Sequence, residues 1–290
     1  MIARLFLRLA ILLAASCAVA GCAQESARDW PEPAPALWQV TSPAGQDAWL
    51  FGTVHALPAD LDWGTPLLDD TFENAGVLVV EIANLDAAYG SSLISQLATT
   101  PGQPPLPTRV DPDERPALRA LMDDAGMDSE DFDDVETWAA ALMLSGAVRI
   151  GDPGRGVDRT LIAHADNIVG LETYGQQLAL FDHLSEEAQS DLLHGVAEAH
   201  AIQSEETMLT SWVTGDAEAM GEQVNLSLQD SPELRRVLLV DRNRNWTGQI
   251  TRMIDAGQRP FVAVGAGHLS GADSVVEMLE AAGYGTRRIQ

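Results

Sequence analysis

Residues 48–55 read Ala-Trp-Leu-Phe-Gly-Thr-Val-His, and residues 261–268, near the other end of the chain, read Phe-Val-Ala-Val-Gly-Ala-Gly-His. Each stretch is a short apolar run that ends in a histidine three residues after a glycine. A buried strand that stops at glycine and then presents a polar side chain is typical of a ligand site at the edge of an α/β sheet. His55 and His268 are 268 − 55 = 213 residues apart, so only the fold can bring them together.

The segments between these two stretches predict a large helical insertion. The predicted strands span residues 37–41, 49–54, 77–82, 167–171, 260–265 and 284–289. The predicted helices span residues 66–75, 111–127, 132–150, 157–165, 174–215, 232–257 and 272–282, and loops span residues 99–107 and 151–156. We therefore expect a single α/β domain whose mixed central sheet is formed by N- and C-terminal strands, with a large helical insertion.

The first residues predict a secreted protein. Arg4 and Arg8 precede or flank an apolar run, residues 9–20, which is too short to span a bilayer as a permanent helix. Residues 19–22 read Val-Ala-Gly-Cys and resemble a bacterial lipobox, which is cleaved before a cysteine that then receives lipid. An ordinary secretory signal that is cleaved near the same place is the alternative.

Cleavage at this motif divides the chain into three predicted parts. Residues 1–21 form a lipoprotein signal peptide, and residues 22–36 form a Pro-rich tether that carries the lipid on Cys22. Residues 37–290 form the folded domain. Alanine rather than aspartate follows the cysteine, at Ala23, which fits sorting to the outer membrane. We therefore expect a protein of the bacterial cell envelope, anchored in the outer membrane and facing the periplasm.

The composition excludes several kinds of chemistry. The formal charge is −26, which argues against nucleic acid as a partner, and all 17 basic residues are arginines, which excludes lysine-based catalysis. Cys17 leaves with the predicted signal and Cys22 carries the predicted lipid, so the folded body has no thiol for a disulfide, a nucleophile or a thiolate zinc site. Any metal ion must therefore be held by imidazole and carboxylate groups.

Several polar residues follow or interrupt the predicted strands. Glu81 lies in an otherwise apolar strand, and because a buried carboxylate without a partner is costly, it needs a cation or hydrogen-bond donors beside it. Glu172 is either a second carboxylate of the site or a helix-end charge beside Thr173. Arg242 with Asn243 marks either a solvated helix start or an arginine that binds a carbonyl oxygen or a substrate carboxylate.

His55 and His268 are the candidate ligands or bases. A neutral imidazole can bind a divalent ion or accept a proton near neutral pH. The remaining histidines are interpreted as surface or structural residues, because they lie in helical stretches and form no His-Glu-x-x-His pair. They are His164, His183, His194 and His200.

Taken together, these motifs resemble the TraB/PrgY/GumN family, which includes the animal Tiki proteins. The resemblance covers residues 37–289 and rests on Gly-Thr-Val-His at 52–55, Val-Val-Glu at 79–81, Gly-Leu-Glu-Thr at 170–173, Arg-Asn at 242–243 and Gly-Ala-Gly-His-Leu at 265–269. It implies an α/β domain and, from the Tiki branch, a metal-dependent peptidase that cuts near the N-terminus of a secreted target. It also implies that His55 and His268 are metal ligands and that Glu81 is a ligand or base.

The leading hypothesis is accordingly a hydrolase with one divalent ion, Mn, Co or Zn, held by His55, His268 and Glu81. Arg242 would stabilise the developing oxyanion. Asn243 and Glu172 are assigned to substrate binding. The substrate, a peptide or another small molecule, is not identified by the sequence.

Two alternatives remain open. The order of His55, Glu81, Arg242 and His268 is also similar to that of erythromycin-esterase-like proteins, in which a histidine is thought to activate water without metal. In that form of the hypothesis His55 is a general base paired to Glu81. The second alternative is a non-catalytic lipoprotein that binds a peptide or signal at the cell surface.

Overall fold

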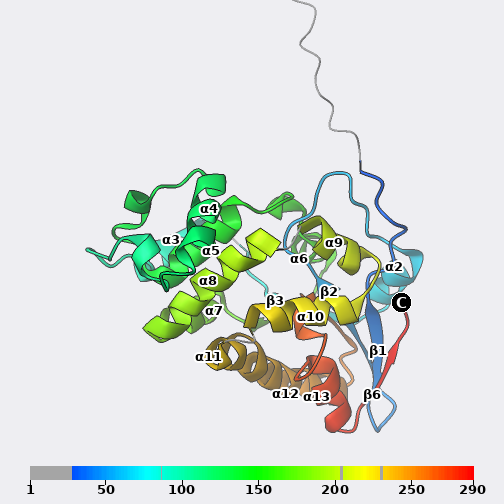
Figure 1. Ribbon diagram of the computed structural model, residues 1–290. Helices are drawn as coiled ribbons and strands as arrows, with labels where there is room; N and C mark the ends of the chain where they lie inside the picture. The colour runs from blue at the N-terminus through cyan, green and yellow to red at the C-terminus, as the bar shows by residue number, and fades with distance from the viewer. Residues whose placement is uncertain (1–27, 86, 203–204, 229–230) are drawn as a thin grey trace, which may run out of the picture. The chain divides into compact units, whose positions relative to one another are not determined.

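The computed structural model describes residues 28–290 except residues 86, 203–204 and 229–230 (Figure 1). The predicted signal peptide and the predicted lipid anchor at Cys22 therefore lie outside the described residues. Residues 31–290 form one compact unit. Within the described ranges, no helix has both the length and the apolar character needed to cross a membrane.

A six-stranded mixed sheet has the strand order β4-β3-β5-β2-β1-β6. The strands are β1 (Leu37–Thr41), β2 (Asp47–Thr53), β3 (Val77–Ile82), β4 (Ile168–Glu172), β5 (Pro260–Gly265) and β6 (Gly285–Arg288). Strands β4, β3, β5 and β2 are parallel to one another, whereas β1 pairs antiparallel with both β2 and β6. Since the late strand β5 lies between the early strands β2 and β3, the predicted mixed sheet built from both ends of the chain is confirmed.

The two Gly-x-x-His stretches lie side by side in this sheet. In the pairing of β2 with β5, Gly52 is opposite Val264 and Thr53 is opposite Gly265. Both strands therefore end at the same edge of the sheet, and each histidine follows its strand there. The two strand ends approach closely at Gly52, where a Cβ atom would lie 3.0 Å from the Cβ of Ala266.

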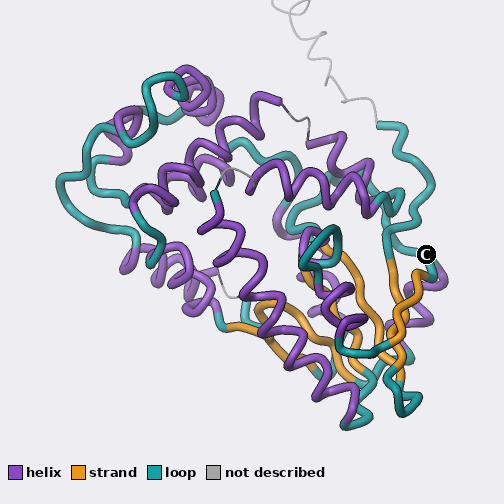
Figure 2. Tube along the Cα trace, turned by 60° about the horizontal axis from the view of Figure 1, so that its bottom comes forward, coloured by secondary structure: helices purple, strands orange, loops and turns teal. Residues whose placement is uncertain are grey.

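Helices cover the sheet and form a lobe beside it. The helices are α2 (Pro66–Glu73), α3 (Ala87–Leu97), α4 (Arg115–Ala125), α5 (Thr137–Ala147), α6 (Val157–His164), α7 (Tyr174–Asp182), α8 (Glu186–Ile202), α9 (Glu205–Val213), α10 (Ala217–Leu228), α11 (Pro232–Arg235), α12 (Asp241–Asp255) and α13 (Val275–Ala281). Short 3-10 turns are η1 (Leu106–Thr108), η2 (Ser129–Phe132), η3 (Pro153–Arg155) and η5 (Ala266–His268), and η4 (Arg236–Val240) is a π-helix. Figure 2 shows the strands gathered on one side and the helices of the insertion on the other.

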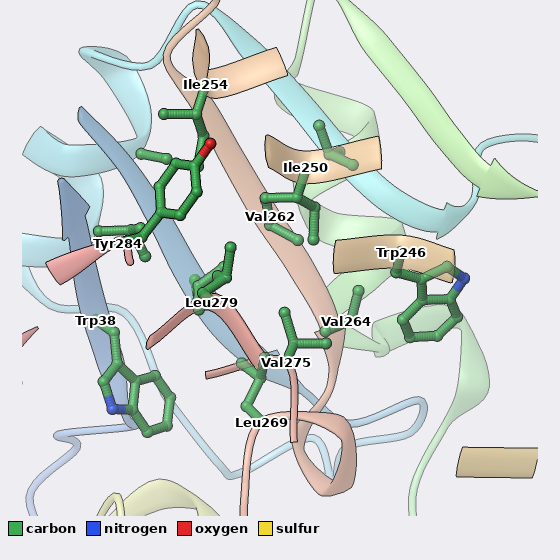
Figure 3. Close-up of a cluster of buried hydrophobic side chains, with 14 of the residues drawn as sticks. Trp38, Trp246, Ile250, Ile254, Val262, Val264, Leu269, Val275, Leu279 and Tyr284 are labelled. Atoms are coloured by element: carbon green, nitrogen blue, oxygen red, sulfur yellow. The ribbon is translucent and has the colours of Figure 1, made fainter. Parts of the chain in front are cut away.

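The main core lies between the sheet and the pair α12 and α13. Figure 3 shows side chains of β5, α12 and α13 meeting there, namely Val262, Val264, Trp246, Ile250, Ile254, Val275 and Leu279. Successive side chains of a strand point to opposite faces, so Phe261 lies on the other face, where its ring contacts Phe51 and Phe72. The central strands β2, β3 and β5 are therefore buried on both faces, as their continuous apolar sequences predict.

The predicted helices differ from the observed ones mainly in continuity. Residues 174–215 contain α7, α8 and α9, and the Ser185 hydroxyl, which accepts a hydrogen bond from the Ala188 N–H, starts α8. Residues 232–257 divide into α11, the π-helix η4 and α12. Helices α3 and α10 were not predicted. The helix predicted from residue 132 begins instead at Thr137, after the turn η2.

Candidate functional site

Glu81 lies near the end of β3, and its carboxylate is supplied with donors from three parts of the chain. Its Oε2 atom accepts hydrogen bonds from Arg242 Nη2 at 2.6 Å and from Gln177 Nε2 at 3.2 Å. Its Oε1 atom accepts the Gly265 N–H at 2.8 Å. A Cβ atom at residue 265 would lie 3.1 Å from Oε1, so glycine permits this contact. The cation and donors that the burial of Glu81 requires are therefore present.

Arg242, near the start of α12, is the centre of the cluster. Its Nε donates to both carboxylate oxygens of Glu172 at 3.2 Å. Its Nη1 donates to His268 Nε2 at 3.1 Å and to the Leu238 carbonyl of η4 at 3.2 Å. Its Nη2 donates to Glu81 and, at 3.1 Å, to Glu172. A guanidinium has five N–H donors, and these contacts use all of them.

His268, in η5, is held at both ring nitrogens. Its Nδ1 lies 2.6 Å from Asn243 Oδ1, and the same amide donates through Nδ2 to the Asp273 carbonyl at 2.8 Å. Arginine only donates, so His268 Nε2 accepts from Arg242, and Nδ1 carries the proton that is donated to Asn243. Burial lowers the pKa of His268 to about 4, and the charge of Arg242 adds to this effect against the opposing charge of Glu81. The imidazole is therefore neutral at neutral pH.

The charges of the cluster keep Glu81 ionised. Burial alone raises the pKa of Glu81, but His268, which is protonated at the low pH where Glu81 titrates, and Arg242 outweigh burial and lower the pKa to about 2. Burial likewise lowers the pKa of Arg242, whereas Glu81 and Glu172 raise it by more, so the net shift is upward. The cluster therefore contains a permanent cation.

Glu172 belongs to this cluster and does not cap the following helix. Its Oε1 atom accepts the indole N–H of Trp246 at 2.9 Å, and the Trp246 ring lies 4.4 Å from the His268 ring between centroids. Helix α7 is capped instead by Thr173 and Gln176, which form a reciprocal capping box. Glu172 is therefore a second carboxylate of the buried cluster around Arg242 and not a helix-end charge.

His55 differs from these buried groups, because its side chain is 65% exposed. Its Nδ1 atom is 2.9 Å from Asp158 Oδ2, and the Thr53 hydroxyl donates to Asp158 Oδ1 at 2.8 Å. The hydrogen bond to Asp158 is the main cause that raises the pKa of His55 above 6.5. Partial desolvation of the ring by the atoms packed around it opposes this effect, the charge of Glu81 adds to it, and the charge of Arg149 opposes it. No hydrogen bond links His55 to Glu81 in the described part of the chain, so the partner of this imidazole is Asp158.

A glycine loop brings Asp158 to His55. The loop before α6 packs so closely on the segment after β2 that a Cβ atom at Gly156 would lie 2.4 Å from the His55 carbonyl oxygen. The Val157 N–H donates to the Val54 carbonyl at 3.0 Å, which fixes the start of α6. Asp158, in the first turn of this helix, then points at the imidazole. This carboxylate was not predicted from the sequence, although a glycine loop followed by an aspartate at a helix start is visible there.

The two residues predicted to bind substrate, Asn243 and Glu172, both contact other protein groups. Asn243 is fully buried and holds His268, and Glu172 is bound by Arg242 and Trp246, so both side chains contact protein groups. Their predicted contacts with substrate stay predictions. Gln177 and Trp246, which donate to the two glutamates, were also missed; neither has a sequence signal beyond a polar atom on a helix near the site.

The predicted ligand set does not fit a divalent ion in this arrangement. The Nδ1 atom of His268 is held by Asn243, and its Nε2 atom, the nitrogen left for an ion, faces the Arg242 guanidinium. Both oxygens of Glu81 are engaged by donors. Among the described residues, no group of three or more histidine, cysteine or acidic side chains is arranged to hold an ion.

Comparison with known proteins identifies the family. The TraB/PrgY/gumN family model matches residues 36–288, which is almost the whole of the unit that carries the sheet and the site. No curated protein and no solved structure matches the chain significantly. The match covers both Gly-x-x-His stretches, both glutamates and Arg242, which are the residues on which the resemblance was based. The chain belongs to the TraB/PrgY/gumN family.

Proposed function

We propose that this chain is a hydrolase that uses His55 as a general base to activate water, with a peptide as the substrate class that the family suggests. The observation that carries the proposal is the pair formed by His55 and Asp158. The imidazole is exposed and its Nδ1 is held at 2.9 Å by a buried carboxylate, so Nε2 is free to take a proton. Because His268 Nε2, the nitrogen left for an ion, accepts from Arg242, the geometry supports the metal-independent form of the hypothesis over the metal-dependent one.

The reaction begins with a water molecule beside His55 Nε2. Nε2 takes one proton from the water while the oxygen adds to the substrate carbonyl carbon and forms a tetrahedral intermediate. The bond from that carbon to the leaving nitrogen or oxygen then breaks, and the proton on Nε2 passes to the leaving group. Asp158 and Glu81 stabilise the transient imidazolium, because both raise the pKa of His55.

The buried cluster has a supporting part in this proposal. Glu81 binds the Gly265 N–H and Arg242, so it fixes the end of β5 and the start of α12 at the edge of the sheet beside β2. Arg242 contributes its positive charge to the developing oxyanion through space, since its N–H donors are already engaged. Direct donation to an oxyanion would require one of its present contacts to open.

The proposed setting is the cell envelope. The N-terminal sequence supports cleavage before Cys22 and lipid attachment to that residue, and the location that follows is the outer membrane facing the periplasm. Lipid analysis of the purified full-length protein by mass spectrometry tests this part. An unmodified N-terminus further along the chain would contradict it.

The test of hydrolysis is a peptide-library digest read by mass spectrometry, with parent, His55→Ala, Asp158→Asn and His183→Ala proteins. We expect cleavage by the parent and by His183→Ala, whose histidine is exposed at the C-terminal end of α7. Loss of His55 should lower kcat/KM by about 10²–10⁴-fold, the usual contribution of a general base. Saturable binding of a peptide that is recovered intact would support the non-catalytic alternative, and full activity of His55→Ala would refute the assigned base.

A further inference from the structure

Three acceptor atoms converge on the Arg242 guanidinium. Glu81 Oε2 lies 2.6 Å from Nη2, Glu172 Oε2 lies 3.1 Å from the same nitrogen, and His268 Nε2 lies 3.1 Å from Nη1. Two carboxylates and an imidazole are also the set of groups that binds zinc or manganese in proteins. The cluster therefore has the composition of a metal site with an arginine at its centre.

The surroundings of His268 match those of a metal-binding histidine. Its Nδ1–H is donated to Asn243 Oδ1, which is itself fixed through the Asp273 carbonyl. Metal-ligating histidines usually donate their second ring N–H to a carboxylate, carbonyl or water, and this bond sets the tautomer that presents the other nitrogen. His268 thus presents a bare Nε2 to the cluster, and Arg242 occupies the position in front of it.

Arg242 and a divalent ion cannot share this position. An ion bound to His268 Nε2 would lie about 2.0–2.2 Å from that nitrogen, whereas Nη1 is already 3.1 Å away from it. Two cations would then be nearly in contact. Arg242 does not relieve the conflict by losing its proton, because a guanidinium stays protonated in proteins and two carboxylates face this one.

The charge balance shows what the removal of Arg242 would create. Glu81 and Glu172 are buried, and one guanidinium faces both. Without it, two buried carboxylates and the His268 lone pair would have no cation, an arrangement that favours the entry of a cation or the uptake of protons. A divalent ion would neutralise both carboxylates.

We infer that Arg242 is the resident cation of the Glu81–Glu172–His268 cluster, that it excludes a divalent ion, and that its removal opens a metal site there. The inference concerns cation binding and does not depend on the proposed hydrolysis. It differs from what the family resemblance implies, because the histidine and the glutamate assigned to metal are satisfied by a side chain of the protein.

The experiment measures bound Zn and Mn in full-length parent, Arg242→Ala and Arg244→Ala proteins by mass spectrometry, after incubation with each ion and gel filtration. Arg244 is the matched control, since it lies on the same helix and pairs with the exposed Asp241. We expect no retained ion in the parent or in Arg244→Ala, and about one ion per chain in Arg242→Ala. The gain in affinity should be at least about 100-fold, in line with the cost of an unpaired buried charge.

A second variant keeps the inference testable if Arg242→Ala folds poorly. Arg242→Gln retains part of the side-chain volume and carries no charge, and a rise of its melting temperature with added Zn would report the same site. Arg242→Gln with His268→Ala should lose that rise. Near-stoichiometric metal in the purified parent would overturn the inference, and so would the failure of both Arg242 variants to bind an ion. Neither readout requires turnover.

Discussion

The depressed pKa of His268 predicts a specific acid lability of the fold. Between its folded pKa of about 4 and its ordinary value of 6.5, His268 binds a proton in the unfolded chain but not in the folded one. Lowering the pH through this window therefore stabilises the unfolded state. The contribution of neutral His268 to stability is complete above about 6.5 and is lost progressively as the pH falls toward 4.

The magnitude follows from the width of the window. The difference of 6.5 − 4 = 2.5 units corresponds to about 3 kcal/mol of the free energy of unfolding, at about 1.4 kcal/mol per unit. Glu81 does not contribute to the loss of stability in the part of this pH window above 4.5. Its pKa is lowered from 4.5 to about 2, so the stability that its ionised form contributes is lost only below pH 4.5. His55 acts in the opposite direction, since its raised pKa gives stability that is present below 6.5 and lost at higher pH.

His268→Gln is the variant that isolates this effect. A glutamine amide oxygen can still accept from Arg242, but it does not titrate. We would measure urea unfolding of both proteins at several pH values from 7.5 to 4 and plot the difference in free energy of unfolding. The parent should lose about 3 kcal/mol more than the variant across this range. A difference that does not change with pH would refute the assignment of a buried neutral imidazole to His268.

Three further predictions test the geometry around the site. Gly156→Ala should destabilise the fold by about 1–3 kcal/mol, because its Cβ would lie 2.4 Å from the His55 carbonyl oxygen. Gly146→Ala is the control and should be neutral or stabilising, because no atom lies within 4 Å of its Cβ. Thermal unfolding measures both variants. Arg149→Gln should raise the pKa of His55 further, since the Arg149 charge lowers it, and a downward shift in an NMR titration would contradict this. Trp246→Phe should lower the free energy of unfolding in urea by about 1–3 kcal/mol, because the Glu172 carboxylate loses one hydrogen-bond donor. An unchanged unfolding midpoint would mean that the contact adds no stability.

The strands and their positions could be predicted because their signals are local. The apolar runs before Gly52 and Gly265 mark buried strands, and the glutamate in the run that ends at Ile82 required a partner whatever its identity. Glu172 was ambiguous for a physical reason, since the Thr173 and Gln176 pattern after it is also a helix-start signal. Both features are present at once, and only the fold shows which group the carboxylate contacts.

The partners of the site could not be predicted, because they depend on contacts between distant segments. Asp158 reaches His55 across 103 residues, and no spacing in the sequence marks that pair. The π-helix before α12 is equally hidden, since its residues are ordinary helix formers. It brings the Leu238 carbonyl to Arg242 and so supplies one of the acceptors that use up the guanidinium donors.

The two Gly-x-x-His stretches look equivalent in the sequence, but their surroundings give the histidines opposite properties. His55 is exposed and bound to a carboxylate, so its pKa is raised; His268 is buried and faces an arginine, so its pKa is lowered to about 4. Titratable groups whose pKa values are pushed apart in one site usually divide the acid–base work between them. At neutral pH the buried imidazole of His268 is neutral, whereas His55 binds a proton more readily than an ordinary histidine because its pKa is raised. In the proposed hydrolysis, proton transfer is therefore assigned to His55, and His268 is the neutral acceptor of an Arg242 N–H.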